Sequence, residues 1–303
     1  MTAGAVPGKF VGPQGPRPRR WWAPSRVFIY GVLILMALFY LFPLYVVIVT
    51  SFKDQKEVMF SGIFALPARP TVEGWVKAWD TGCIALTCEG IKIGFWNSMV
   101  IVVPSVTLSI LAGSVCGYVL AYWPYRGAEF FFLLLLLCIF IPQPVLLYPI
   151  AQLLGTVKLM GTVWAAVLVN IVMGLPFMAL LFRSGFASVP PDLWRAARVD
   201  GAGFWRIYAQ IVMPLMLPTL GVALVLSVTY TWGDYMFTMV LGGPYYPTIT
   251  MLYHNLVDSR YGVAEYNVQM AATILTGAVP LLVYFLCGRL FMRGVAVGVA
   301  PPR

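Results

Sequence analysis

The organisation of this chain follows from one stretch, Val189-Pro-Pro-Asp-Leu-Trp-Arg-Ala-Ala-Arg-Val-Asp-Gly-Ala-Gly-Phe-Trp-Arg-Ile207, and its continuation, Ile211-Val-Met-Pro-Leu-Met-Leu-Pro218. It is a charged, helix-forming connection between two segments that carry almost no charge. Its charged residues are Asp192, Arg195, Arg198, Asp200 and Arg206. A polar element placed between long apolar segments indicates a region that contacts something outside a membrane.

The composition around this stretch is that of a polytopic, all-α membrane protein. Of the 303 residues, 60% are apolar and only 10% are charged, with a mean hydropathy of +0.85. A soluble domain of this size needs far more charge to cover its surface. About 20 apolar residues cross a bilayer, and this length predicts about six transmembrane helices. They fall at roughly 27–49, 96–122, 130–150, 162–182, 211–241 and 270–292.

Two of these spans contain residues that disturb a helix. Pro142, Pro144 and Pro149 lie near the outer end of the third span, and the fifth is long enough to tilt or break near Gly233. Proline is tolerated within a membrane only where neighbouring groups satisfy the freed carbonyls. We therefore expect the end of the third span to pack in the bundle or to line a cavity.

The distribution of Lys and Arg predicts that both termini are cytoplasmic. With the N-terminus inside, the inner segments hold 13 basic and three acidic residues, whereas the outer segments hold seven of each. Basic residues are retained on the cytoplasmic side. The resulting domains are a basic, disordered tail (1–26), a membrane domain (27–293) with an outer loop (51–95) and a cytosolic loop (185–210), and a cytosolic C-terminal tail (294–303). The basic pI is thus a topology signal, and no aromatic–basic pattern indicates a nucleic-acid partner.

The cytosolic loop reads as two short helices joined by a break. Pro190 and Pro191 suit the first turn of a helix, and good helix formers follow as far as Val199. Asp200-Gly201 ends that helix because glycine can take a positive φ, and a second helix can form over 204–210. Two short helices at an angle make a knob that could enter another protein. The alternative is an amphipathic helix that lies on lipid headgroups, which does not require the break at Gly201.

The spacing within this loop resembles the "EAA" loop of ABC-importer permeases. Ala196-Ala197, Gly201-Ala202, Pro214 and Pro218 carry the resemblance. Further along, Thr231-Trp-Gly-Asp-Tyr235 is similar to a signature of carbohydrate-uptake permeases, and Arg289-Leu-Phe-Met-Arg-Gly-Val-Ala-Val-Gly298 resembles the tail of the second permease of maltose-type importers. The outer loop with its two cysteines is more loosely similar to glucose/mannose-type permeases. The resemblance covers about 30–303.

The resemblance implies a type I ABC-importer permease fold and a sugar-transport role in the bacterial inner membrane. The implied partners are a second homologous permease, an ABC ATPase dimer that holds ATP and Mg, a periplasmic or lipid-anchored sugar-binding protein, and membrane lipid. The chain itself would bind no cofactor. The implied coupling residues are Asp192, Arg195, Ala196, Ala197, Asp200, Gly201, Ala202, Pro214 and Pro218. Where the family usually has Glu before the two alanines, this chain has Arg195, so the docking ion pair is absent, reversed in sign or supplied by Asp200.

Four residues near the end of the fifth span are candidates for the substrate pathway: Tyr230, Trp232, Asp234 and Tyr235. A carboxylate within a span usually faces a cavity or a partner, but Asp234 is only an interfacial residue if the helix ends near 231. The three aromatic rings could stack on sugar rings or could simply pack in the bundle. Both interpretations remain open for each residue.

The cysteines and the single histidine give little sign of catalytic chemistry. Cys83 and Cys88 lie in the outer loop and could form a disulfide in an oxidising compartment, or remain as two thiols. His254 with scattered carboxylates makes neither a metal site nor a catalytic triad, and no P-loop motif is present. Three other functions are alternatives: an ABC permease for an amino acid, peptide or polyamine, a stand-alone polytopic membrane enzyme, and a secondary transporter.

Overall fold

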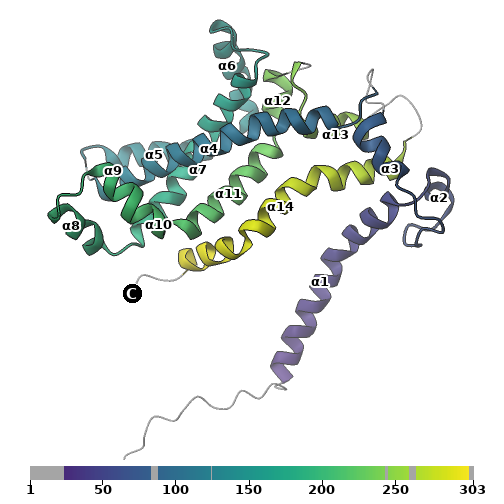
Figure 1. The fold of residues 1–303 in the computed structure, drawn as a ribbon, viewed down its shortest axis with the longest axis horizontal. Helices are drawn as coiled ribbons and strands as arrows, with labels where there is room; N and C mark the ends of the chain where they lie inside the picture. Colours follow the sequence, from purple (N-terminus) through teal and green to yellow (C-terminus); the bar gives the residue numbers. More distant parts are fainter. Residues whose placement is uncertain (1–23, 83–87, 124, 243–244, 259–263, 300–303) are drawn as a thin grey trace, which may run out of the picture. The chain divides into compact units, whose positions relative to one another are not determined.

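The computed structural model describes residues 24–82, 88–123, 125–242, 245–258 and 264–299. Over these residues the secondary structure is helical, with no strand. The elements are α1 (Pro24–Ser51), α2 (Gln55–Phe60), α3 (Glu73–Val76), η1 (Lys77–Thr81), α4 (Lys92–Tyr122), α5 (Ala128–Ile139), α6 (Gln143–Thr156), α7 (Val163–Ala187), α8 (Pro191–Val199), α9 (Phe204–Arg206), η2 (Ile207–Val212), α10 (Met213–Leu215), α11 (Leu217–Trp232), α12 (Met236–Leu241), α13 (Ile249–Val257) and α14 (Tyr266–Val299) (Figure 1). The predicted all-α class is confirmed.

The chain divides into two compact units, Met1–Val46 and Val47–Arg303. The first holds most of α1, whose apolar side chains are exposed along the helix; Phe28, for example, is 73% exposed. A helix that is apolar on every side and this long is suited to a membrane. The predicted tail (1–26) lies largely outside the described residues, because these begin at Pro24.

Among the residues that the structure describes, four helices are long and apolar enough to cross a membrane, and two bent pairs bring the count to as many as six. The single helices are Arg26–Ser51, Lys92–Tyr122, Val163–Ala187 and Tyr266–Met292. The pairs are Ala128–Ile139 with Gln143–Thr156, bent by 104°, and Phe204–Leu215 with Leu217–Trp232, bent by 81°. The expected number of about six spans therefore holds when each pair counts as one.

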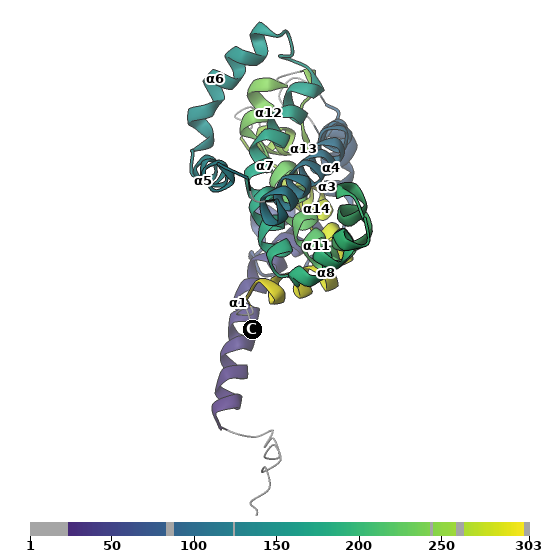
Figure 2. The same ribbon diagram turned by 90° about the vertical axis from the view of Figure 1, so that its left-hand side faces the viewer.

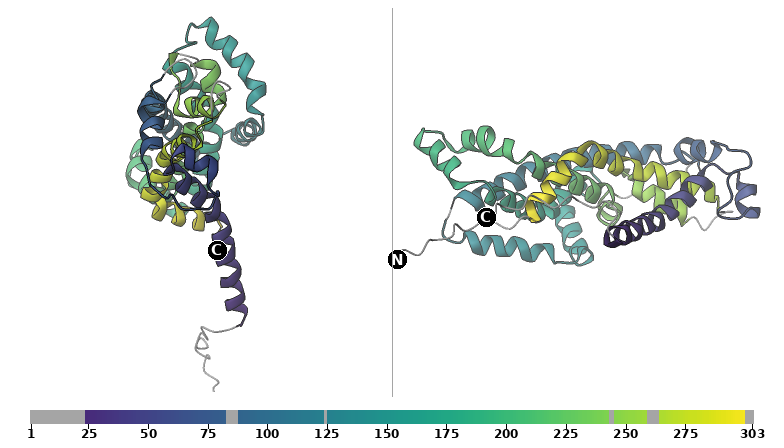
Figure 3. Two further views of the ribbon diagram at one scale, coloured as in Figure 1. Left: turned by 90° about the vertical axis from the view of Figure 1, so that its right-hand side faces the viewer. Right: turned by 90° about the horizontal axis from the view of Figure 1, so that it is seen from below.

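The bent pairs correct two predicted spans. The third, predicted as one segment over 130–150, turns a corner between α5 and α6 (Figures 2 and 3), because Pro142 cannot continue the hydrogen-bond ladder and sits in extended backbone. The fifth, predicted over 211–241, bends at Met216 and ends at Trp232. The expected break near Gly233 is confirmed, since Gly233 follows the last residue of α11 and α12 begins separately at Met236.

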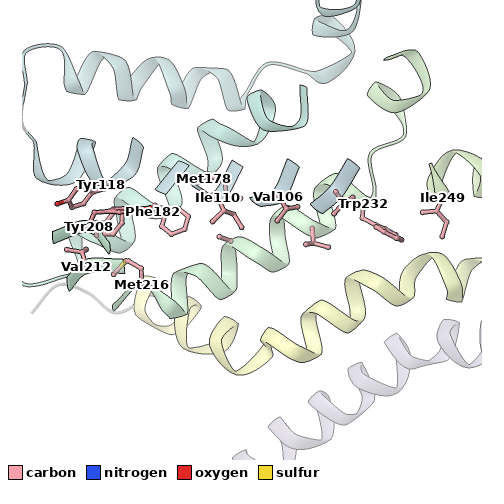
Figure 4. Close-up of a cluster of buried hydrophobic side chains, with 14 of the residues drawn as sticks. Val106, Ile110, Tyr118, Met178, Phe182, Tyr208, Val212, Met216, Trp232 and Ile249 are labelled. Carbon is pink, nitrogen blue, oxygen red and sulfur yellow. The ribbon is translucent and has the colours of Figure 1, made fainter. Parts of the chain in front are cut away.

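Within the second unit, α4 and α7 form the closest-packed pair. A Cβ added at Gly113 of α4 would lie 2.3 Å from Cβ of Met178 on α7, so the two backbones meet at a distance that only glycine permits. Buried side chains of α4, α7 and α11 then form one continuous core (Figure 4). It runs from Tyr118 and Tyr208 at one end to Trp232 and Ile249 at the other.

The predicted outer loop is structured where it is described. Part of it forms the short helices α3 and η1, and Nζ of Lys77 lies 3.0 Å from the Glu265 carboxylate and 3.1 Å from that of Glu73. Hydrogen bonds to Glu265 and Glu73 raise the pKa of Lys77. At the other end of the chain α14 continues to Val299, so residues 294–299 of the predicted C-terminal tail are helical.

Candidate coupling surface and cavity

The local sequence sets both ends of α8. Pro191 and Asp192 occupy its first turn, where a missing N–H costs nothing and a carboxylate favours the positive end of the helix dipole. At the other end Gly201 has φ +79°, and the Ala202 N–H donates to the Ala197 carbonyl at 2.9 Å. This left-handed cap is one that glycine adopts readily. The predicted break at Asp200-Gly201 is confirmed.

One face of α8 packs against the ends of the membrane helices. Ala197 is only 7% exposed, and its small side chain lets the helix approach closely. The Trp194 ring lies 5.5 Å from the ring of Tyr122 in α4. The Arg198 guanidinium is 5.4 Å from the Trp123 ring centre and 5.6 Å from that of Trp194, within the range of a cation–π contact.

A group of rings, here called the aromatic anchor, joins the knob to α4 and α7. It consists of Tyr118, Tyr122, Trp123, Phe186, Trp194, Phe204 and Tyr208. Its phenol groups are also hydrogen-bonded: the Tyr122 hydroxyl donates to the Phe186 carbonyl at 2.9 Å, and those of Tyr208 and Ser114 lie 2.7 Å apart. Figure 4 shows Tyr118, Phe182 and Tyr208 gathered at this end of the core.

Sequence reasoning did not single out the aromatic anchor. The available signal was a pair of tyrosines four residues apart, Tyr118 and Tyr122, at the end of an otherwise apolar span. Residues at this spacing lie on one helix face, and buried tyrosines need a hydrogen-bond partner.

The opposite face of α8 is open to solvent and is here called the docking stripe. It comprises Asp192, Arg195, Ala196 and Val199, whose spacing of three and four residues places them in one row. Val199 is 89% exposed, which is unusual for a branched apolar side chain. Arg195 makes an exposed contact of 3.6 Å with the Asp192 carboxylate. Of the predicted coupling residues, Ala197 thus faces inward, whereas Asp192, Arg195 and Ala196 face outward beside Val199.

The remaining predicted coupling residues lie at the joints that follow. Asp200 is exposed at the end of α8, and Ala202 is partly buried at the entry to α9. Pro214 and Pro218 flank Met216, where the chain bends by 81°. Since proline has no N–H to donate, both positions weaken the helix ladder at this point. They mark the place where the knob joins the fifth span.

Midway along the bundle, α5, α6, α7 and α11 enclose a cavity of about 360 Å³. Ligand pockets typically measure roughly 300–1,000 Å³ and combine apolar walls with a few polar groups. The lining residues are Cys138, Ile139, Ile141, Gln143, Asn170, Met173, Gly174, Phe177, Met178, Leu226, Ser227, Tyr230 and Thr231. None of them is charged. The expectation that the end of the third span lines a cavity is confirmed by Ile141 and Gln143.

Only one of the four predicted pathway residues lines this cavity. Tyr230 does, and its hydroxyl accepts a hydrogen bond from Nε2 of Gln143 across the gap between α11 and α6. Trp232 instead is 3% exposed and donates from Nε1 to the Thr276 carbonyl at 2.8 Å. It therefore packs in the bundle. Gln143 and Asn170 were not identified from the sequence, although amide side chains within apolar spans were the available signal.

The other two candidates lie just beyond α11. The Asp234 carboxylate accepts from the Phe237 N–H at 3.2 Å and from the Thr238 hydroxyl at 2.9 Å, and so closes the first turn of α12. Tyr235 stacks on His254 with the ring centres 4.3 Å apart. Asp234 also hydrogen-bonds to the side chain of Asn170, which lines the cavity. Its contacts with α12 favour the structural interpretation, and the stack on His254 does so for Tyr235. For Asp234 the reason is that its helix ends at Trp232, before the carboxylate.

The structure describes one of the two cysteines of the predicted disulfide. Cys88 is disulfide-bonded, whereas Cys83 lies outside the described residues, so the pairing stays a prediction. Among the residues described, no group of three His, Cys, Asp or Glu side chains could hold a metal ion.

This arrangement matches a known family. Residues 94–297, from α4 through most of α14, match the binding-protein-dependent transport system inner membrane component. The chain belongs to this family. The match includes both the knob and the cavity, and membership places the chain among ABC-transporter permeases of the inner membrane.

The chain is similar to several permeases of uptake systems. It is 30% identical over 268 residues to the arabinooligosaccharides transport system permease protein AraQ of Halalkalibacterium halodurans, covering 85% of this chain and 90% of that protein. It is 27% identical to the diacetylchitobiose uptake system permease protein NgcG of Streptomyces coelicolor, covering 89% and 87%. It is 28% identical to the sn-glycerol-3-phosphate transport system permease protein UgpE of Yersinia pestis, covering 89% and 95%.

The fold is also that of a solved transporter. A bacterial ABC transporter involved in the import of the acidic polysaccharide alginate superposes with a TM-score of 0.72 at 19% identity, covering 91% of this chain and 99% of that chain. The type I importer permease fold predicted from the sequence is thereby confirmed.

Proposed function

We propose that this chain is the permease subunit of an ABC importer for an uncharged sugar, and that its docking stripe seats the ATPase. The observation that carries the proposal is the two-sidedness of α8. Its inner face is joined to α4 and α7 through the aromatic anchor, whereas its outer face presents Val199 to solvent. A helix built in this way can receive a push on one side and deliver it to the membrane helices on the other.

The side chains of the docking stripe define what the complementary surface of the ATPase must provide. Val199 requires an apolar pocket, and Ala196 allows close backbone approach. Arg195 is the cation on this face, with its guanidinium 5.9 Å from the Trp194 ring centre, while Arg198 contacts two indole rings. The ATPase groove is therefore expected to place an acidic group near Arg195. This corresponds to a docking pair reversed in sign, one of the arrangements that the sequence left open.

Alternating access follows from this connection. Closure of the ATPase dimer on ATP would displace α8, and the aromatic anchor would carry the displacement to the ends of α4 and α7. Since α7 also lines the cavity, the opening of the cavity would change with it. ATP can shift this equilibrium only to the extent that it binds the two states differently, and a sugar-loaded binding protein at the opposite face would supply the second bias.

The cavity supports a neutral, hydroxyl-rich solute. Its polar groups are the amides of Gln143 and Asn170 and the hydroxyls of Ser227, Tyr230 and Thr231. They can exchange hydrogen bonds with sugar hydroxyls, while Phe177 offers an aromatic face. No basic residue in the lining would balance a phosphate or a carboxylate, so a phosphorylated or acidic solute fits less well. The relatives named for arabinooligosaccharides and diacetylchitobiose agree with this class, whereas the relative named for sn-glycerol-3-phosphate and the importer of alginate handle anionic solutes.

The remaining features of the importer follow from the same assignment. The knob and both termini would face the cytoplasm, in agreement with the excess of basic residues there. ATP and Mg would be held by the ATPase, since this chain has no P-loop motif. A second permease would complete the pathway, and the chain would perform no covalent chemistry of its own.

The proposal is tested by co-purification of the complete importer. Val199→Asp would place a carboxylate in the apolar pocket and near the expected acidic group, and is expected to remove the ATPase from the purified complex. Val72→Asp is the matched control, because Val72 is 61% exposed and precedes α3, away from the knob. Retention of the ATPase by both variants would contradict the docking role. Stimulation of ATP hydrolysis only by a binding protein loaded with an anionic or zwitterionic solute would contradict the neutral sugar.

A further inference from the structure

The loop after α1 exposes more apolar surface than a water-facing loop would. Between Met59 and Leu66, five large apolar side chains are at least half exposed. They are Met59 (60%), Phe60 (89%), Ile63 (64%), Phe64 (56%) and Leu66 (70%). Singly exposed apolar residues are ordinary on a protein surface, but a continuous group of them indicates contact with another apolar phase.

Two charged side chains hold this loop through hydrogen bonds. Lys53 is only 2% exposed, and its Nζ donates to the Ser61 hydroxyl at 3.2 Å and to the Gly62 carbonyl at 3.0 Å. The Glu57 carboxylate accepts from the Ala68 N–H at 2.7 Å. The apolar residues belong to a folded loop that these hydrogen bonds hold in place, so their exposure is a property of the fold.

The short stretch of chain between α1 and residues 59–66 limits which surfaces this apolar group can contact. α1 ends at Ser51, and α2 begins four residues later at Gln55. At about 1.5 Å of rise per residue, the six residues of α2 add only about 9 Å. The headgroup region on each side of a bilayer is roughly 5–7 Å thick. The group at 59–66 therefore lies within reach of the membrane surface from which α1 emerges.

We propose that residues 59–66 form an interfacial anchor that inserts into the headgroup region of the bilayer, with lipid as its partner. The apolar side chains would enter the boundary between headgroups and acyl chains. Lys56 and Arg69, which flank the group and are exposed, would reach the lipid phosphates, as long basic side chains do at interfaces. This assignment depends on the membrane location of the family and not on the identity of the solute.

The position of the anchor gives it a mechanical role. η1 follows it in the chain and hydrogen-bonds to the start of α4, where the Ile91 N–H donates to the Ala78 carbonyl at 2.9 Å. The aromatic anchor holds the other end of α4. Figure 1 shows α2 and α3 at one end of α4, and α8 and α9 at the other. The loop would keep one end of this helix at the membrane surface while the knob moves the other.

The test is depth-dependent fluorescence quenching of the full importer in lipid nanodiscs. A small fluorescent amino acid replaces Phe60 in one preparation and Ile63 in another. Asp80, which is exposed in η1, provides the matched control position. Quenching by lipids that carry a nitroxide at the headgroup is expected at positions 60 and 63 and not at 80, with iodide in the buffer showing the reverse order.

Two results would overturn the proposal. Strong iodide quenching at 60 and 63, with no effect of the nitroxide lipid, would place the loop in water. Protection from both quenchers would show that a protein surface, such as the second permease, covers the loop. In both cases ATPase docking through Val199 would be unaffected, so failure of this proposal is distinguishable from failure of the proposed function.

Discussion

The knob and the wall of the cavity are held to the same bundle in opposite ways. The knob is joined to α4 and α7 by tilted and edge-to-face rings, by the hydrogen bond between Tyr208 and Ser114, and by the buried Ala197. The wall formed by α5 and α6 has less buried packing: each of these helices buries a single side chain, Leu135 and Leu154 respectively, and an ion pair of 2.8 Å between Glu129 and Arg183 ties α5 to α7. A hydrogen bond between Gln143 and Tyr230 connects the corner to α11.

This difference separates two tasks of a transport subunit. A part that transmits a displacement must not deform, and close aromatic packing resists deformation because every shift loses many contacts. A wall that opens and closes around a solute must change its contacts at low cost, so few buried side chains suit it. The knob is therefore expected to tolerate little change, and the cavity wall more.

The largest effect is expected for Ala197→Glu. Its carboxylate would be forced against the aromatic anchor, where burying an unpaired charge costs at least about 3 kcal/mol. The knob should detach from α4, and the ATPase should be lost from the purified complex. Ala209→Glu is the control, because Ala209 is exposed in η2. Equal ATPase binding by the two variants would show that the aromatic anchor does not hold the knob.

Filling the cavity should separate transport from docking. Ser227→Leu places a larger side chain in the cavity lining, and an overpacked site typically loses about 1–3 kcal/mol. Sugar uptake into vesicles should fall strongly, while the ATPase remains bound. Thr229→Leu lies two residues away on α11, outside the lining, and should transport normally. Full uptake by Ser227→Leu would exclude this cavity from the pathway.

Substitution by alanine should have different effects at the two glycines of the knob. Gly201 has φ +79°, so Gly201→Ala must adopt a left-handed conformation at a cost of about 1–2 kcal/mol. Gly203 has φ −76° and open space around it, so Gly203→Ala should be nearly neutral. The measurement is the ATP hydrolysis stimulated by the binding protein. An equal loss in both variants would mean that the left-handed cap is not what orients the docking stripe.

The smallest effect is expected at Asp234. Asparagine also accepts hydrogen bonds at the start of a helix, so Asp234→Asn should change transport and stability little, whereas Asp234→Ala should cost about 1 kcal/mol. Thermal unfolding and uptake of the two variants are the measurements. A severe loss in Asp234→Asn would instead assign the negative charge to the transport pathway.

The structure of the knob could be predicted from the sequence more fully than that of the cavity, and the reason is physical. The end of α8 at Gly201 and the division of the knob into two helices depend on local chain chemistry, which adjacent residues specify. The cavity depends on where α6, α7 and α11 meet, and an apolar span reveals little about which of its faces meets which neighbour. The Asn170 amide was visible within its span, but that it lines the same cavity as Ser227 follows only from the packing of two helices.

The corner between α5 and α6 shows the same limit. Pro142 predicted a disturbance, yet its 104° size depends on tertiary contacts that no local pattern specifies. Trp232 was a candidate for sugar stacking because of its neighbours in sequence. The structure buries it, and its indole N–H is taken up by the Thr276 carbonyl, a contact between residues distant in the chain.

The central claim, that the outward face of α8 docks the ATPase, is tested most directly by site-specific photo-crosslinking. A photoreactive amino acid replaces Val199 on the docking stripe, and in a separate preparation Trp194 on the inward face, in membranes that contain the complete importer. The account predicts an ATP-sensitive crosslink from position 199 to the ATPase, and from position 194 only crosslinks within this chain. A crosslink from position 199 to lipid alone would show that α8 lies on the membrane surface and would contradict the account.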